Sequence, residues 1–449
     1  MMEAKDEISF KLFGQDLNVI LAVVANILSW LVATLAPSFL SYLLPNIDEE
    51  DKSPSTSPVQ TQCIAIGRPG GIEQLRTITL KPGFVTVGYN LGFPSPFVNL
   101  SDKTDEELPS GTVVVEIQAF SVNYADCCIR WGLYESANKF VGWPIVPGFD
   151  IAGVVERVSA SGDTDNISLA VGDKVYGATF FGAYSSRCLV PGRQLRRIPS
   201  DLSFAEAASL PAVSMTALYT LYLGGRFPAQ DCTPQNKSIL IHSAAGGVGG
   251  MLVQMSKLLG LSPVVGIVGR SSKVDHPKSL GCDTVIDKSG FKSPSELWEE
   301  IQSANKAQGY SIIADANGVS TLRGSFDHLC ATGRLVVFGF HSNLPMGQDM
   351  LNPWVWLQMI WKMAHMPKFD AMDLVVSNKS LLGFNLSFFV DEISMLGQIY
   401  DQIGAWLKEG KLVVPRITEL PMAEIGTAHQ LLQSGKSVGK IVMLTKSET

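Results

Sequence analysis

The chain has 449 residues, enough for two or three domains, and carries 35 Lys and Arg against 42 Asp and Glu. This slightly acidic balance, without any basic run, argues against a nucleic-acid partner. The seven cysteines form no CxxC pair, which indicates reduced thiols and argues against a disulfide framework or a zinc ribbon.

The N-terminal segment predicts a membrane anchor over residues 1–47. Leu17 to Ala36 supplies a mostly apolar run before Pro37, and a helix of about 20 residues reaches roughly 30 Å, the thickness of a bilayer core. The run has no polar face for a soluble helix, and the acidic residues before it are unlike a cleaved secretory signal. The flanking charges leave a single span and a helix lying in one leaflet both open, while the free cysteines favour a cytosolic catalytic domain.

Residues 48–61 are charged and then rich in Pro and Ser, which is typical of a linker. From residue 62 to 202 the chain predicts a β-rich domain, because short β-branched runs alternate with glycine at Thr112–Ile117, Ile151–Val155 and Lys174–Gly177. A helical pattern follows between Ser203 and Ala217.

A glycine-rich turn at residues 244–249 is the strongest chemical signal in the chain. An apolar strand-length run ending at Ile241 enters the turn, a helical pattern leaves it, and a second apolar run, Val264–Val268, follows. The pattern predicts a βαβ dinucleotide site in which Gly246 lets the backbone approach a pyrophosphate and Gly249 lets the helix pack closely. The candidate cofactor contacts are Ala245, Gly246, Gly247, Val248 and Gly249.

The end of the second strand favours NADPH. NAD-preferring sites usually carry an acidic residue about 20 positions beyond the glycines, whereas this chain has Arg270, Ser271 and Lys273 there. These residues are candidate ligands of the 2′-phosphate. The alternative is that they are solvated residues at the start of the next helix.

Later strands are expected at Thr284–Ile286, Ser311–Ala314 and Arg334–Gly339, with helices at 296–305 and 321–329 between them. This alternation predicts an α/β fold with a doubly wound parallel sheet over residues 203–378. Residues 379–449 return to short strands and helices, ending in the strand Lys440–Leu444.

Several motifs between Gln62 and Leu444 resemble the medium-chain dehydrogenase/reductase superfamily, in its zinc-independent quinone oxidoreductase branch. They are Ser121–Asp126, Arg130–Tyr134, Val146–Gly153, Gly172–Val175 and the turn at 244–249. Leu351–Phe369 and Leu382–Leu386 further resemble the vesicle amine transport protein homologues. The resemblance implies a GroES-like catalytic domain, residues 62–202 and 379–449, into which a Rossmann domain is inserted.

The motifs argue against a metal. Asn123, Phe149 and Asp150 stand where zinc-dependent relatives carry cysteine, histidine and glutamate, and an amide and a phenyl ring are not zinc ligands. Without a Lewis acid, the expected reaction is hydride transfer from NADPH to a quinone or an α,β-unsaturated carbonyl.

The resemblance also implies roles for individual residues. Tyr134 would contact the nicotinamide end, Asn123 would shape the substrate pocket, and either could donate a hydrogen bond to the growing oxyanion. The alternative is that both side chains are structural. The resemblance adds a homodimer, nicotinamide contacts at Asn317, Phe338, Gly339 and Phe340, and phosphate contacts at Lys273 and Lys288.

Residues 353–368 combine three tryptophans and several methionines with basic residues. Such a helix fits a lid or dimer core, and also a membrane interface. Together with the anchor, it motivates an alternative function: a membrane or lipid-handling protein with a structural or sensing NADPH site. An enoyl-thioester reductase is disfavoured, because no basic site for a phosphopantetheine carrier is evident.

Overall fold

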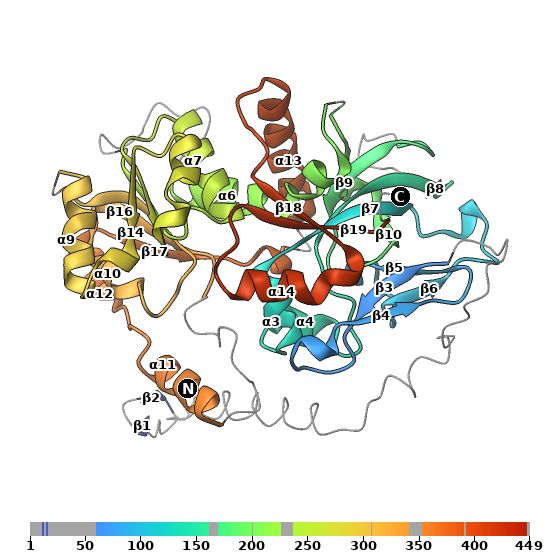
Figure 1. The fold of residues 1–449 in the computed structure, drawn as a ribbon, viewed down its shortest axis with the longest axis horizontal. Coiled ribbons are helices and arrows are strands. Elements are labelled where there is room, and N and C mark those ends of the chain that lie inside the picture. The colour runs from blue at the N-terminus through green and yellow to red at the C-terminus, as the bar shows by residue number, and fades with distance from the viewer. Residues whose placement is uncertain are drawn as a thin grey trace, which may run out of the picture.

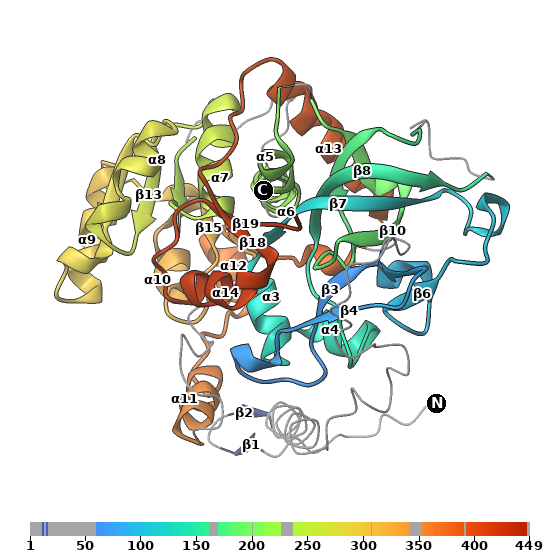
Figure 2. The same cartoon turned by 45° about the vertical axis from the view of Figure 1, so that its right-hand side comes forward.

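The computed structural model describes residues 11–12, 15–16, 60–160, 169–199, 201–225, 237–306, 308–340, 353–389 and 392–446. The described residues between 60 and 446 form a β-rich lobe and an α/β lobe that lie side by side in both views (Figures 1 and 2). The chain builds most of the β-rich lobe first, crosses to the α/β lobe and then returns. Both the α/β class and the GroES-like arrangement of a returning chain are confirmed.

The β-rich lobe is built around β7 (Thr112–Val122), the buried β-branched run that the sequence indicated. It pairs with β8 (Asp150–Val158) along one side, and with β10 (Arg187–Pro191) and β19 (Lys440–Leu444) along the other. The C-terminal strand β19 thus lies beside the end of β7. The other strands of this sheet are β5 (Phe84–Val87), β6 (Phe97–Asn99), β9 (Lys174–Ala178), β11 (Leu195–Arg197) and β18 (Ile417–Pro421), and β3 (Gln62–Ala65) pairs with β4 (Arg76–Thr79) in a separate hairpin.

The α/β lobe contains a parallel sheet in the order β14-β13-β12-β15-β16-β17. Neighbouring residues of its central strand enter different apolar clusters, with Ile239 and Ile241 on one face and Leu240 on the other. This doubly buried pattern is what a parallel sheet covered by helices requires. The strands are β12 (Ile239–Ile241), β13 (Val264–Val268), β14 (Thr284–Asp287), β15 (Tyr310–Asp315), β16 (Leu329–Val337) and β17 (Ser380–Gly383).

In the α/β region, helix α7 (Gly247–Leu258) follows β12 directly and starts at the glycine-rich turn. The others are α6 (Pro211–Leu223), α8 (Asp275–Ser279), α9 (Pro294–Ala304), α10 (Leu322–Asp327), α11 (Pro353–Ala364) and α12 (Ala371–Ser377). The β-rich lobe and the return segment contribute α3 (Tyr124–Arg130), α4 (Glu135–Phe140), α5 (Phe204–Ala208), α13 (Ile393–Lys408) and α14 (Ile425–Gln433).

The structure differs from the predicted elements at three places. The helical pattern at 203–217 is two helices, α5 and α6, because Pro211 begins a new helix. The strand expected at 334–339 starts earlier, at Leu329. The sheet also takes β17 from beyond residue 378, where the sequence placed the domain boundary, because Ser380–Gly383 pairs in parallel with β16.

The predicted anchor at residues 1–47 lies outside the described residues, apart from two short strands, β1 (Lys11–Leu12) and β2 (Gln15–Asp16), which pair antiparallel. No helix in the described part of the chain has the length and apolar character needed to cross a membrane.

Candidate functional site

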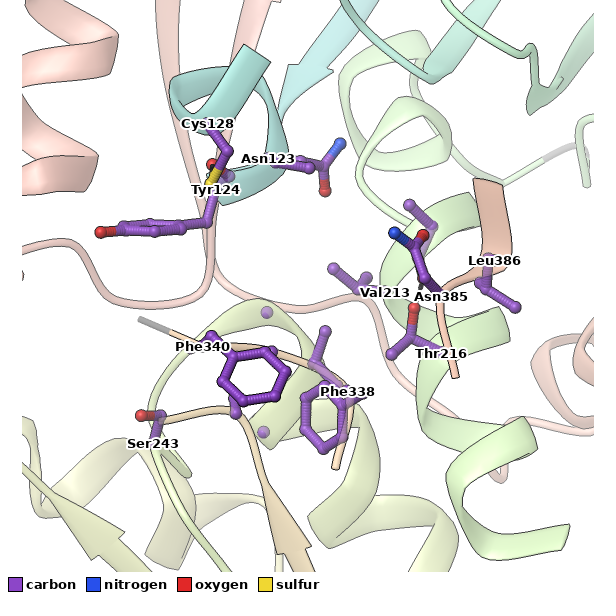
Figure 3. A pocket seen from close by; sticks show the side chains of 18 of the residues that line it. Asn123, Tyr124, Cys128, Val213, Thr216, Ser243, Phe338, Phe340, Asn385 and Leu386 are labelled. Atoms are coloured by element: carbon purple, nitrogen blue, oxygen red, sulfur yellow. Dashed lines mark hydrogen bonds between the residues drawn. The ribbon is translucent and has the colours of Figure 1, made fainter. Parts of the chain in front are cut away.

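A cleft of about 1220 Å³ lies between the two lobes and takes lining residues from both. It contains all but one of the site residues predicted from the sequence, since Ser271 is absent from its lining. The predicted residues that line it are Asn123, Tyr134, Ala245, Gly246, Gly247, Val248, Gly249, Arg270, Lys273, Lys288, Asn317, Phe338, Gly339 and Phe340. These predicted residues, which are up to 217 positions apart in the sequence, thus share one cavity, part of which Figure 3 shows.

The glycine-rich turn brings backbone to the cleft wall. Ser243 adopts a positive φ of 58° as the chain leaves β12. A Cβ at Gly249 would lie 2.3 Å from the Ser243 carbonyl oxygen, so only glycine allows α7 to pack this closely on the turn. At Gly246 an added Cβ would meet only that same oxygen, at 3.4 Å, so the backbone beside the start of α7 is open. This cradle of glycine and free helix N–H groups fits a dinucleotide pyrophosphate.

Basic side chains lie where the second strand of the βαβ unit ends. The Lys273 ammonium donates a hydrogen bond to the carbonyl oxygen of Ser437 at 2.5 Å. Burial, followed by the neighbouring charge of Arg270, lowers the pKa of Lys273. Arg270 is half-buried, Lys288 is exposed, and neither side chain hydrogen-bonds another described residue. Arg270 and Lys288 are therefore available to a phosphate, whereas the Lys273 ammonium is already hydrogen-bonded.

Asp315, at the end of β15, holds a loop that lies next to the glycine-rich turn. Its carboxylate accepts hydrogen bonds from the backbone N–H groups of Asn317 and Gly318 and from the Thr321 hydroxyl. The Asn317 side-chain oxygen accepts from the Ser243 hydroxyl at 3.2 Å. Asn317 is thus fixed next to the glycine-rich turn, where the resemblance placed a nicotinamide contact.

Asn123 precedes α3 and points toward the cleft (Figure 3). Its side-chain oxygen accepts from the Lys440 ammonium at 2.5 Å, and its side-chain nitrogen donates to the Asp150 carboxylate at 2.8 Å. The backbone N–H of Asn123 donates a hydrogen bond to the Asp126 carboxylate at 2.7 Å. The amide is therefore held by charged side chains at the cleft wall.

Tyr134 lies before α4, and its hydroxyl donates to the Asn385 side-chain oxygen at 3.0 Å. Burial raises the pKa of Tyr134 to about 12, although hydrogen bonds with Ser387 and Asn385 act in the other direction. Its ring packs edge-on against Phe149, whose ring also contacts Phe181. Tyr134 is thus a neutral residue whose hydroxyl proton is committed to Asn385.

Three polar residues of the cleft region were not predicted as site residues. Lys440 and Asp150 are buried and form an ion pair at 3.2 Å, and Asn385 presents its amide on the wall facing Asn123 (Figure 3). Asp150 and Lys440 are each the first residue of an otherwise mostly apolar strand, where burying a charge is costly unless it is paired. A charged residue at such a position was the sequence signal that could have identified them.

Within the described ranges, no three His, Cys, Asp or Glu side chains lie close enough together to hold a metal ion. Cys127 is fully buried, and its burial raises the pKa of its thiol to about 12.

A buried histidine lies against α3, and its burial is expected to make stability depend on pH. His429 of α14 lies 3.1 Å from the Tyr184 hydroxyl and 3.5 Å from the Cys127 sulfur. Burial, followed by the charge of Arg130, lowers the pKa of His429 to about 3. The unfolded chain therefore takes up this proton near pH 6.5, whereas the folded chain resists it.

We therefore expect the contribution of His429 to stability to be complete above pH 6.5 and to be lost as the pH falls towards 3. The expected slope is about 1.4 kcal/mol per pH unit in the free energy of unfolding. Denaturant titrations of the unaltered chain and of His429→Gln between pH 7 and 4 measure the difference. Equal slopes in the two proteins would contradict the assignment.

Two family models match the chain: an alcohol dehydrogenase GroES-like domain over residues 109–216, and a zinc-binding dehydrogenase domain over residues 280–443. A synaptic vesicle membrane protein VAT-1 homolog from Danio rerio is 28% identical over 348 residues, which are 76% of this chain and 65% of that protein. A lovastatin diketide synthase from Monascus pilosus is 30% identical over 350 residues, which are 76% of this chain and 12% of the synthase.

Among solved structures, Escherichia coli quinone oxidoreductase complexed with NADPH superimposes with a TM-score of 0.65 at 21% identity. The match covers 85% of this chain and 99% of the bacterial one, so it shows a shared fold. The two lobes, the glycine-rich turn at their junction and both matched models show that the chain belongs to the medium-chain dehydrogenase/reductase superfamily.

Proposed function

We propose that the protein is a zinc-independent NADPH oxidoreductase that reduces a quinone or an α,β-unsaturated carbonyl. The observation that carries the proposal is that one cleft holds the glycine-rich turn, the half-buried Arg270 and the amide of Asn123. The fold is shared with a quinone oxidoreductase that binds NADPH. Phe149, in place of a zinc ligand, packs against aromatic rings.

The chain's own residues would position the cofactor and the substrate. The N–H groups at the start of α7 would hold the pyrophosphate, and Arg270 with Lys273 would hold the 2′-phosphate. When bound, NADPH supplies the hydride. Asn123 would donate a hydrogen bond to the substrate oxygen on which negative charge grows. Tyr134 would support this wall through Asn385, because its own hydroxyl proton is already used.

The test is NADPH oxidation by the full chain, with an ortho-quinone and with a simple enone, in buffer treated with a chelator. Turnover with either acceptor is the expected result. Tight NADPH binding without turnover on either acceptor would contradict the proposal.

Arg270 carries the expected preference for NADPH over NADH. We expect Arg270→Ala to weaken NADPH binding by roughly 10- to 100-fold, because a hydrogen bond to a charged group contributes about 1.5–3 kcal/mol. NADH, which lacks the 2′-phosphate, should bind the variant and the unaltered chain alike. Lys273→Ala should weaken NADPH binding less than Arg270→Ala does, because the Lys273 ammonium already donates a hydrogen bond to the Ser437 carbonyl.

Equilibrium titration of cofactor fluorescence measures both affinities. The matched control is Lys292→Ala, an exposed cation outside the cleft lining. Equal weakening of NADPH and NADH by Arg270→Ala would refute the phosphate assignment.

A second candidate function is a membrane or lipid-handling protein in which NADPH is a structural or sensing ligand. The observation that favours it is helix α11, in which Val355 packs against Cys127 and Trp131 while Leu357 and Trp361 stay more than half exposed. An outward apolar stripe is typical of helices at a lipid interface. Anchoring through residues 1–47, cytosolic placement of the catalytic domain and a homodimer also remain predictions. Binding of the holoprotein to lipid vesicles, without turnover on quinone or enone, would favour this candidate.

A further inference from the structure

The cluster around Asn123 contains a lysine that the proposed reaction has not yet used. Lys440 is 4% exposed and lies at the start of β19, against the end of β7. Its ammonium donates to the Asn123 side-chain oxygen at 2.5 Å, to the Asp150 carboxylate at 3.2 Å and to the Val122 carbonyl at 3.2 Å. An ammonium has three N–H donors, so all of them are used within the protein. Lys440 therefore has no proton to offer a substrate.

Asp150 completes the cluster from the other side. One carboxylate oxygen accepts from the Ser121 hydroxyl at 2.5 Å and from the Asn123 side-chain nitrogen at 2.8 Å. The other oxygen accepts from the backbone N–H of Ala212 at 2.7 Å. The carboxylate is fully buried and is held by strand β7, helix α6 and β19 together. These contacts fix the position of the carboxylate to which the Asn123 amide donates.

The two charges allow only one orientation of the Asn123 amide. The oxygen must face the ammonium and the nitrogen must face the carboxylate, because the flipped amide would place an N–H against Lys440 and an oxygen against Asp150. A primary amide has two N–H groups, and one of them is donated to Asp150. The other N–H has no partner among the described residues, on a side chain that lines the cleft.

We infer that Lys440, paired with Asp150, is a positioning residue that presents this remaining N–H of Asn123 to the substrate oxygen. The inference rests on the proposed function and assigns the polarity of the site. The cleft offers a donor at this point, so the substrate must offer an acceptor such as a quinone or enone oxygen. The ammonium also polarises the amide, which strengthens the outward N–H as a donor.

The location of Lys440 supports this role. The preceding residue, Gly439, donates its N–H to the Ala245 carbonyl of the glycine-rich turn at 2.9 Å. A Cβ on Gly247 would lie 3.3 Å from Cδ of Lys440. The same short segment also receives the Lys273 hydrogen bond at Ser437. The lysine that orients Asn123 is thus attached to the turn that would hold the cofactor.

A double-mutant cycle on the holoprotein tests the inference. Lys440→Met is made in the unaltered chain and in Asn123→Ala, and 1,2-naphthoquinone binding is titrated with the protein loaded with NADP⁺, so that no turnover is needed. NADPH-dependent kcat and KM are measured in parallel. We expect Lys440→Met to lower kcat about tenfold in the unaltered chain and less than twofold in Asn123→Ala, whereas quinone binding should change much less in both backgrounds.

The controls separate positioning from folding. Lys440→Arg keeps the charge and should stay within about threefold of the unaltered chain. Lys446 lies in the same C-terminal segment as Lys440 and forms an exposed ion pair with Glu116. Lys446→Met should change neither kcat nor quinone binding. If Lys440→Met does not fold, the variant Lys440→Met/Asp150→Asn removes both buried charges and should show the same tenfold loss.

Each outcome decides between the two ideas. Equal losses from Lys440→Met in both Asn123 backgrounds would overturn the positioning role alone, because the lysine would then act independently of the amide. An unaltered NADP⁺-loaded chain that binds no quinone and gives no turnover would overturn the proposed function, and the inference with it.

Discussion

Gly249→Ala is expected to lower the affinity for NADPH by roughly 10- to 100-fold and to destabilise the fold by about 1–3 kcal/mol. The new Cβ would lie 2.3 Å from the Ser243 carbonyl oxygen and 2.6 Å from Cα of Ala244. Both are backbone atoms, so α7 must move away from the end of β12. The N–H groups at the start of α7 move with it, and they are the groups that would hold the pyrophosphate. Fluorescence titration and thermal unfolding measure the two effects.

The same substitution at Gly404 is the matched control. Gly404 lies within α13, where an added Cβ meets nothing within 4 Å and φ is not positive. Alanine should therefore leave NADPH binding unchanged and stabilise the helix by up to about 1 kcal/mol. If Gly249→Ala bound NADPH as the unaltered chain does, the close packing of turn and helix would not be what shapes the cofactor site.

Asn123→Ala is expected to lower kcat on an ortho-quinone by roughly 100- to 1,000-fold, the loss that follows removal of one donor to a growing oxyanion. KM should change much less, because the hydrogen bond strengthens only as charge develops on the substrate oxygen. Tyr134→Phe should lower kcat by less than about tenfold, because the Tyr134 hydroxyl donates to Asn385 and would not contact the substrate directly. Steady-state kinetics of the two variants give the comparison.

A nearby amide provides the control for Asn123. Asn138 is exposed on α4 and donates to the Gly132 carbonyl, outside the cleft lining. Asn138→Ala should leave kcat unchanged. A value of kcat for Asn123→Ala within about threefold of the unaltered chain would show that Asn123 is a structural residue, which was the alternative for this position.

The half of the cleft around the glycine-rich turn, which is proposed to hold the cofactor, was the more predictable half. The strand, turn and helix around Gly246 are consecutive in sequence, and the apolar period changes where β12 gives way to α7. Arg270 and Lys273 follow the next strand directly. Ser271 was predicted with them but does not line the cleft, because it lies exposed in a short 3-10 turn whose successive side chains point in different directions.

The substrate half depends on contacts between distant parts of the chain. The hydrogen bond from Lys440 to Asn123 joins residues 317 positions apart, and that from Tyr134 to Asn385 joins residues 251 apart. Local patterns carry no information about such pairs. The same limit explains why β17 fell outside the predicted domain, since its place in the sheet comes from pairing with β16.

The sequence by itself determined the α/β class, the return of the chain to its first lobe and the residues of the glycine-rich turn. These depend on hydrophobic period and on glycine's lack of a side chain, which are properties of neighbouring residues. Only the tertiary structure decided that a buried lysine and a buried aspartate hold Asn123, and that the Tyr134 hydroxyl donates its hydrogen bond to Asn385. Buried charges need partners, and the fold alone selects which distant residue becomes the partner.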